Sequence, residues 1–248
     1  MAEATPAQDP RWGAQGRNAK ALAILGTLRS TCGDGITGGQ WLDVGCGSGL
    51  IAATLAPHVG SIRGIDPEPW ERWGSLQAEH GNLRFDAGGV DDLPALVPSA
   101  SIDVAVCNQV YEHVPDPSAL IRELHRVLKP GGRCYFAGPN LVWPIEPHVF
   151  LPFVHWLPRS WVIRGLSSVG VSRIHELDAW SLDAWRLRGL LRRAGFEIRL
   201  AFRARACAGI EVGERGLAAR LASAMPGWLE RATLPLHPGF VFVLRKPD

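Results

Sequence analysis

Short apolar runs alternate with amphipathic stretches through the first 140 residues. Five runs of strand-favouring residues, each bounded by polar or turn-forming residues, predict strands at 40–44, 61–66, 82–86, 101–107 and 133–138. Apolar positions that recur every three or four residues predict helices at 17–29, 49–59, 67–81 and 116–128. Strands that alternate with helices imply right-handed crossovers and a mostly parallel sheet with helices on both faces.

This alternation breaks after Asn140. The stretch "LVWPIEPHVFLPFVHWLP" has four prolines, so it cannot form one continuous helix. The pattern then predicts a helix at 181–195, a strand at 196–206 and a last strand at 239–246. About 30 residues separate these two strands, and a further helix is expected within them, at 215–225.

Composition narrows the class of protein. A chain of 248 residues, 46% hydrophobic, with a net charge of +2, fits one large domain and does not suggest a nucleic-acid binder. Its five cysteines form no CxxC pair, so we expect neither a disulfide framework nor a metal site. We find no signal peptide and no apolar run long enough to span a bilayer, and we expect a cytoplasmic protein.

The loop after the first predicted strand has the sequence "DVGCGSG". It lacks the Lys and Ser/Thr of a phosphate-binding P-loop, and its GxGxG spacing differs from the GxGxxG of dinucleotide-binding folds. Asp43, directly before the glycines, would repel a pyrophosphate but would suit a cationic ammonium group.

A second acid, Asp66, ends the second predicted strand, 23 residues after Asp43. Folds of this kind place a carboxylate there to accept hydrogen bonds from both ribose hydroxyls. A ligand with a ribose, an ammonium group and no phosphate is required, and S-adenosylmethionine meets these requirements.

Three motifs in order carry a family resemblance. "LDVGCGSGL", "GIDPEP" and the stretch from Ser101 to Asn140 resemble class I S-adenosylmethionine-dependent methyltransferases that act on small molecules, with a type 11-like domain. The resemblance is close over 39–140 and looser over "LRGLLRRAGFEI" and the last strand. It implies a Rossmann-like α/β fold: a doubly wound, seven-stranded, mostly parallel sheet whose last strand is antiparallel.

We therefore expect one methyltransferase domain over 1–248. Its expected parts are an N-terminal arm and helix at 1–38, a cofactor-binding core at 39–140, a lid on the acceptor side at 141–181, and the C-terminal part of the sheet at 182–248, with an insertion at about 207–238.

The resemblance also implies a set of cofactor-binding residues for S-adenosylmethionine. These are Asp43, Gly45, Cys46, Gly47, Gly49, Asp66, Pro67, Gly89, Val90, Asn108 and Gln109. One position departs from the family pattern, which has an acid and an alanine shortly before "LP". Gly89 and Val90 stand there, and Asp86-Ala87 lies three residues early, so either the loop is rearranged or the backbone holds the adenine.

The acceptor is expected to face the segment after the fifth strand. We predict His148, Glu146 and His113 as catalytic residues, and Trp143, His155 and His175 as substrate-binding residues. The expected reaction is O-methylation of a small molecule such as a glycan, a lipid-linked intermediate or a natural-product intermediate. A catalytically inactive S-adenosylmethionine-binding or scaffold protein with the same fold is the alternative.

Arginines are concentrated between Arg159 and Arg205, a span that contains ten arginines and four acids. Solvated helix and strand faces explain such a run. Attraction to an anionic substrate, or peripheral contact with a membrane surface, is the second interpretation.

Overall fold

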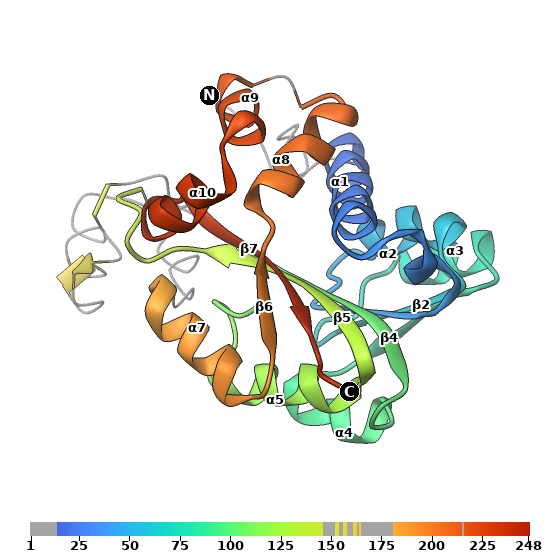
Figure 1. Ribbon diagram of the computed structural model, residues 1–248. Helices are drawn as coiled ribbons and strands as arrows, with labels where there is room; N and C mark the ends of the chain where they lie inside the picture. Colours follow the sequence, from blue (N-terminus) through green and yellow to red (C-terminus); the bar gives the residue numbers. More distant parts are fainter. Residues whose placement is uncertain are drawn as a thin grey trace, which may run out of the picture.

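The computed structural model describes residues 14–145, 152–153, 156–157, 161–162, 164, 181–214 and 216–248. A twisted seven-stranded sheet runs through the molecule, with helices on both of its faces (Figure 1). The strand order is β3-β2-β1-β4-β5-β7-β6. The first five strands pair in parallel and β7 is antiparallel to both of its neighbours. The predicted fold class is confirmed.

The strands are β1 Gln40–Val44, β2 Ser61–Asp66, β3 Leu83–Ala87, β4 Ile102–Asn108, β5 Leu128–Pro139, β6 Glu197–Leu200 and β7 Gly239–Arg245. The α-helices are α1 Ala14–Cys32, α2 Leu50–Leu55, α3 Trp73–Glu79, α4 Leu93–Leu96, α5 Pro117–Val127, α7 Ala184–Arg193, α8 Phe202–Glu211, α9 Leu217–Ala224 and α10 Gly227–Thr233. Short 3-10 helices are η2 Asp34–Gly38, η3 Ala56–His58, η4 Val90–Asp92 and η7 Leu234–Leu236. Within these described residues, no helix is long and apolar enough to cross a membrane.

The central strand β4 is apolar on both faces because two cores meet there. Val104 and Val106 belong to the core beneath α1 and α2, whereas Ala105 and Cys107 belong to the core beneath α5 and α7. Side chains alternate along a strand, so a parallel strand covered on both sides reads as one continuous apolar run. This explains why its sequence signal was clear.

The expected strand at 196–206 was wrong in its second half. Pairing of β6 with β7 ends at Leu200, and α8 begins at Phe202. Arg and Ala, which dominate 203–208, favour helices. α8 packs closely on α1, where a Cβ added to Gly26 would lie 2.9 Å from Ala208 Cβ. Tertiary packing on α1 therefore overrides the alternation seen in the sequence.

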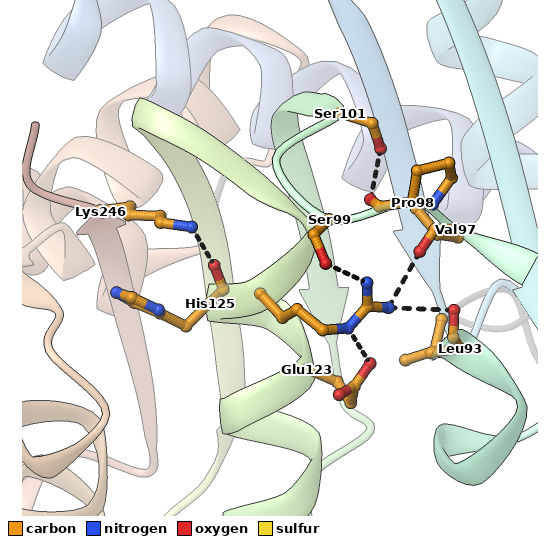
Figure 2. A network of polar contacts seen from close by, with 9 residues as sticks. Leu93, Val97, Pro98, Ser99, Ser101, Glu123, His125 and Lys246 are labelled. Carbon is orange, nitrogen blue, oxygen red and sulfur yellow. Dashed lines mark hydrogen bonds and ion pairs between the residues drawn. The ribbon is translucent and has the colours of Figure 1, made fainter. Parts of the chain in front are cut away.

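Arg126 joins α5 to the end of α4. Its Nε donates to Glu123 at 2.8 Å, and its other nitrogens donate to Ser99 Oγ at 3.0 Å and to the carbonyl oxygens of Leu93 at 3.1 Å and Val97 at 2.9 Å. Figure 2 shows these acceptors around the guanidinium. The Leu93 carbonyl oxygen also accepts from the Val97 amide at 2.9 Å, so Arg126 adds a second donor there and a cation at the carboxyl end of the helix, where a positive charge is stabilising.

Replacement of Arg126 should therefore destabilise the fold. We expect Arg126→Ala to lower the free energy of unfolding by about 2–3 kcal/mol, the scale of hydrogen bonds to a charged group. Urea denaturation measures this change. Arg122→Ala is the control, because Arg122 lies on the same helix but is exposed, and its partner in the described part of the chain is the exposed Asp116. Equal effects of the two substitutions would contradict the role of Arg126.

Candidate active site

The glycine loop between β1 and α2 turns tightly because three of its glycines adopt positive φ. Gly45, Gly47 and Gly49 have φ of 70°, 49° and 80°. A Cβ added to Gly45 would lie 2.5 Å from Val110 Cγ2, and one added to Gly49 would lie 2.5 Å from Phe85 Cζ. The sequence thus provides glycine where the backbone needs left-handed geometry and where neighbouring side chains leave no space.

Asp66, at the end of β2, forms a hydrogen bond with this loop. Its Oδ2 accepts from the Gly47 amide at 2.8 Å, and its Oδ1 accepts from the Glu68 amide at 3.1 Å. Each carboxylate oxygen can accept a further hydrogen bond. Asp66 is only half-buried and can accept hydrogen bonds from a diol that approaches the loop.

Two aromatic rings, those of Trp73 and Phe85, also contact the loop. Trp73 Nε1 donates to the Gly47 carbonyl oxygen at 2.9 Å. The Trp73 ring stacks on Phe85, with ring centroids 5.1 Å apart. Since Phe85 also fills the space beside Gly49, the two rings fix the path of the loop.

Asp43, at the end of β1, is more deeply buried than Asp66. It is 2% exposed, and no hydrogen-bond partner of its Oδ2 is found among the described residues. Burial and the nearby Asp66 carboxylate raise the pKa of Asp43 to about 8. A buried carboxylate of this kind favours a cationic partner strongly.

Arg17, in the first turn of α1, reaches the same loop and donates to Ser48 Oγ. Burial and the charge of Arg72 lower the pKa of Arg17. A cation therefore lies on the loop that also holds the buried Asp43, and the site can bind a ligand that has both an ammonium group and a carboxylate.

The loop after β4 packs against the glycine loop through Val110. Asn108 is the last residue of β4, and Gln109 has a φ of 59° with its amide donating to the Ala137 carbonyl oxygen at 2.8 Å. The next residues turn inward. Tyr111 and Glu112 are fully buried, and the exposed His113 has its Nε2 4.0 Å from Glu112 Oε1.

Tyr111 connects the two ends of the expected lid. Its hydroxyl donates to the Pro139 carbonyl oxygen and accepts from the Leu182 amide at 3.2 Å. Asn140 and Leu182 also form a β-bridge. The chain therefore leaves the sheet after β5 and returns at the same place, beside the loop after β4.

The remaining predicted residues are placed as follows. Pro67 is exposed directly after Asp66, and Cys46 is a buried thiol within the loop. Gly89 precedes η4, with its amide donating to Asp92 Oδ2 at 2.8 Å, and Val90 begins η4. Trp143 is half-buried after β5. Glu146, His148, His155 and His175 lie outside the described residues.

The departure from the family pattern at Asp86 has a physical reason. The Asp86 carboxylate accepts from Arg63 Nε at 2.6 Å, and both side chains are about one-third exposed. Arg63 also donates to the Leu96 carbonyl oxygen. Asp86 thus ties β3 to β2 and to the end of α4.

The sequence pattern did not indicate that Arg17 and Trp73 contact the glycine loop. Both belong to helices in which Arg and Trp have an ordinary structural explanation. A signal for Arg17 existed in its place at the start of the helix that precedes the glycine loop. Trp73 had no separate signal, because Trp70 and Trp73 lie in the same short stretch and only the fold shows which one faces the loop.

Comparison with known proteins supports one family. Residues 42–136 match the model of a methyltransferase domain. The chain is 34% identical over 187 residues to the ubiquinone biosynthesis O-methyltransferase of Pseudomonas syringae pv. tomato, covering 70% of this chain and 77% of that protein. It is 36% identical over 110 residues to the protein of the same name from Idiomarina loihiensis, covering 43% and 45%.

Solved structures share the fold. An S-adenosylmethionine-dependent methyltransferase from Mesorhizobium loti matches with a TM-score of 0.54 and 17% identity, over 92% of this chain and 99% of that one. The cyclase SpnF matches with a TM-score of 0.54 and 23% identity, over 92% and 81%. At such identities the likeness concerns the fold, which can support more than one chemistry.

The glycine loop, the two carboxylates and the family match define an α/β enzyme of the methyltransferase class. The chain belongs to the S-adenosylmethionine-dependent methyltransferases, and its activity is methyl transfer.

The raised pKa of Asp43 predicts a pH-dependent affinity for S-adenosylmethionine. Below pH 8 the acid is largely protonated in the free protein, so it must lose a proton to pair with the ligand's ammonium group. Affinity should therefore rise up to about tenfold per pH unit between about pH 6 and about 7.5, where the ammonium is charged. Calorimetry in buffers of different ionisation enthalpy should detect the released proton.

Two variants test the assignment. Asp43→Asn should bind weakly without this pH dependence. It should also stabilise the free protein more at pH 8 than at pH 5, because the folded protein keeps the Asp43 proton up to about pH 8 whereas the unfolded chain loses it near the ordinary value of about 4, so folding becomes less favourable as pH rises. Asp66→Asn should bind weakly but keep the dependence, moved to lower pH. A flat profile for the unmodified protein would contradict the role of Asp43.

Proposed function

We propose that the protein transfers a methyl group from S-adenosylmethionine to a hydroxyl group of a small molecule. The observation that most strongly supports S-adenosylmethionine as the methyl donor is the buried Asp43 oxygen. It has no partner in the described part of the chain and lies close to the half-buried Asp66. The relatives' description as O-methyltransferases supports a hydroxyl acceptor. Because that description also names ubiquinone biosynthesis, the proposed acceptor is a hydroxylated precursor of a quinone. A cytoplasmic location agrees with five cysteines that form no disulfide.

Each part of the cofactor has a proposed partner. Asp66 accepts from the ribose hydroxyls, Asp43 pairs with the ammonium group and Arg17 with the carboxylate. The backbone of Gly45 to Gly49, with Cys46, borders the methionine part, and Pro67 closes the ribose side. Asn108 and Gln109 lie on the other side of the glycine loop, at the methionine end.

Adenine binding is proposed for the start of η4. The backbone of Gly89 and Val90 is the proposed contact, because the Asp86 carboxylate is engaged by Arg63. Gly88 donates its amide to the Asp66 carbonyl oxygen at 3.0 Å, so this loop begins directly beside the ribose-binding acid.

The bound sulfonium supplies an activated methyl group and leaves as a neutral thioether. The protein then contributes mainly alignment, which is a large effect when the geometry is correct. A hydroxyl acceptor gains from a base near its proton. His148, with Glu146 orienting it, is the proposed base. His113 is the second candidate, and Trp143, His155 and His175 are proposed to contact the acceptor under a lid formed by 141–181.

Binding of the cofactor should depend on Asp66 and Arg17. We expect Asp66→Ala to weaken S-adenosylmethionine binding by about 1.5–3 kcal/mol, since it removes hydrogen bonds to a charged group. Arg17→Ala should weaken it by at least about 1.5 kcal/mol, and Arg17→Lys should weaken it less because the charge is kept. Calorimetric titration measures each affinity.

The control for the Arg17 variants is Arg29→Ala, which removes an arginine from the same helix but away from the glycine loop. Unchanged affinity in Asp66→Ala would remove Asp66 from the site.

Acceptor chemistry should depend on one histidine. His148→Ala should lower kcat by about 10²–10⁴-fold if His148 is the general base, while cofactor affinity changes little. Transfer of labelled methyl to a panel of hydroxylated acceptors measures this. Wild-type turnover in His148→Ala together with an inactive His113→Ala would identify His113 as the base. Cofactor binding without transfer to any acceptor would indicate a binding protein with a methyltransferase fold.

A further inference from the structure

A cavity lies at the β6 edge of the sheet. Its volume is about 370 Å³, and it is bordered by α7, the edge strand β6 and the start of α10. In the strand order, β5 and β7 separate β6 from β4, so the cavity does not belong to the glycine loop. Figure 1 shows α7 and α10 on the same side of the molecule, away from α2 and α3.

Arg188, which lines the cavity, has a buried donor without an acceptor in the described part of the chain. Arg188 Nε is buried, and no acceptor for it is found among the described residues. Burial and the charge of Arg192 lower the pKa of Arg188. A buried donor of a charged group without an acceptor is costly, and an anion beside the same guanidinium would offset part of that cost through its charge.

The other charged residues around the cavity make it positive. Arg231 is exposed at its border. Arg199 also lines it, although its guanidinium donates to the Thr31 carbonyl oxygen at 2.7 Å. The one carboxylate among the lining residues, Glu230, is 7% exposed and accepts from the Arg203 amide at 3.3 Å. The lining residues thus include three arginines and one carboxylate, and since Arg199 is engaged by Thr31, Arg188 and Arg231 are the cations left for a ligand of the cavity.

Two exposed tryptophans accompany these arginines. Trp185 is 63% exposed and Trp228 is 69% exposed. Each lies three residues before a cavity arginine, Trp185 before Arg188 on α7 and Trp228 before Arg231 on α10. Residues three apart lie on one side of a helix. Each helix therefore carries an exposed ring on the same side as its cavity arginine, just outside the lining residues, which suits a ligand with an anionic group and an apolar body.

We propose that this cavity binds a phosphate-type oxyanion, with Arg188 and Arg231 as its principal ligands. A guanidinium matches the geometry of a phosphate through two parallel hydrogen bonds. The oxyanion belongs either to a soluble phosphate ester or to the headgroup of an anionic lipid, since both present the same group to the arginines. The site does not rest on the proposed methyl transfer.

Two probes test the site and separate these sources. The first is inorganic phosphate, titrated at constant ionic strength while the melting temperature is followed, because a ligand that binds the folded state raises it. The second is sedimentation with vesicles of phosphatidylglycerol and phosphatidylcholine, compared with phosphatidylcholine alone. Both are performed with saturating S-adenosylhomocysteine, so that the glycine loop does not contribute.

The decisive variant is Arg188→Gln/Arg231→Gln. The control is Arg193→Gln/Arg220→Gln, which removes the same charge from exposed positions on α7 and α9 that do not line the cavity. We expect the first double variant to weaken phosphate binding, vesicle binding or both by about tenfold or more, and the control to stay within about twofold. S-adenosylhomocysteine affinity should be unchanged in both, which separates this result from any failure of the proposed methyl transfer.

The outcomes distinguish a soluble phosphate ester, a lipid headgroup and the absence of a site. Phosphate binding that Arg188→Gln/Arg231→Gln removes supports a site for a soluble ester. Vesicle binding that is lost in the same variant, and also in Trp185→Ala/Trp228→Ala, supports a lipid headgroup. No binding of either probe, or equal losses in the decisive and control variants, would overturn the site.

Discussion

Asp43 places a carboxylate at the end of a buried strand, where it is 2% exposed and one of its oxygens has no hydrogen-bond partner in the described part of the chain. Burial and Asp66 together raise the pKa of Asp43 to about 8. An isolated fold would be more stable with an uncharged residue there. In the proposed site, a cationic ligand pairs with this acid and offsets the cost of its burial.

The surrounding structure keeps this carboxylate in place. β1 lies between β2 and β4, so the ends of three neighbouring parallel strands meet at one edge of the sheet. Asp66 bonds the glycine loop, Trp73 and Phe85 support it from behind, and Val110 covers it from the loop after β4. Tyr111 then fixes the place where the chain leaves the sheet and returns. The loop after β4 thereby contacts both the glycine loop and the place where the chain leaves the sheet after β5.

Much of this arrangement could be predicted from the sequence, because the core strands are apolar on both faces and the glycine loop has a distinctive spacing. The bounds of β1 and β2 agree with the prediction, and Asp116 caps α5 through the Ser118 amide at 2.8 Å. The start of α8 could not be predicted, because alternating Arg and Ala at 203–206 fit a strand and a helix equally well until α1 is present to pack against.

The residues of the candidate site could be predicted from the sequence only in part. Glycines with positive φ and strand-terminal acids are visible in a sequence, whereas Arg17 and Trp73 act through contacts between elements that are distant in the chain. Asp86 illustrates the converse: its residue type matches the family pattern, but its ion pair with Arg63 is a property of the folded sheet.

The most direct test of the active site is a measurement of the ionisation of Asp43 itself. Nuclear magnetic resonance of carbon-labelled aspartate, assigned by Asp43→Asn, would follow this carboxyl group with and without S-adenosylhomocysteine. The predicted result is a pKa of about 8 in the free protein, which falls toward the ordinary value of about 4 when the ligand's ammonium group pairs with it. A pKa near the ordinary value in both states, or one that the ligand leaves unchanged, would contradict a site arranged around this buried carboxylate.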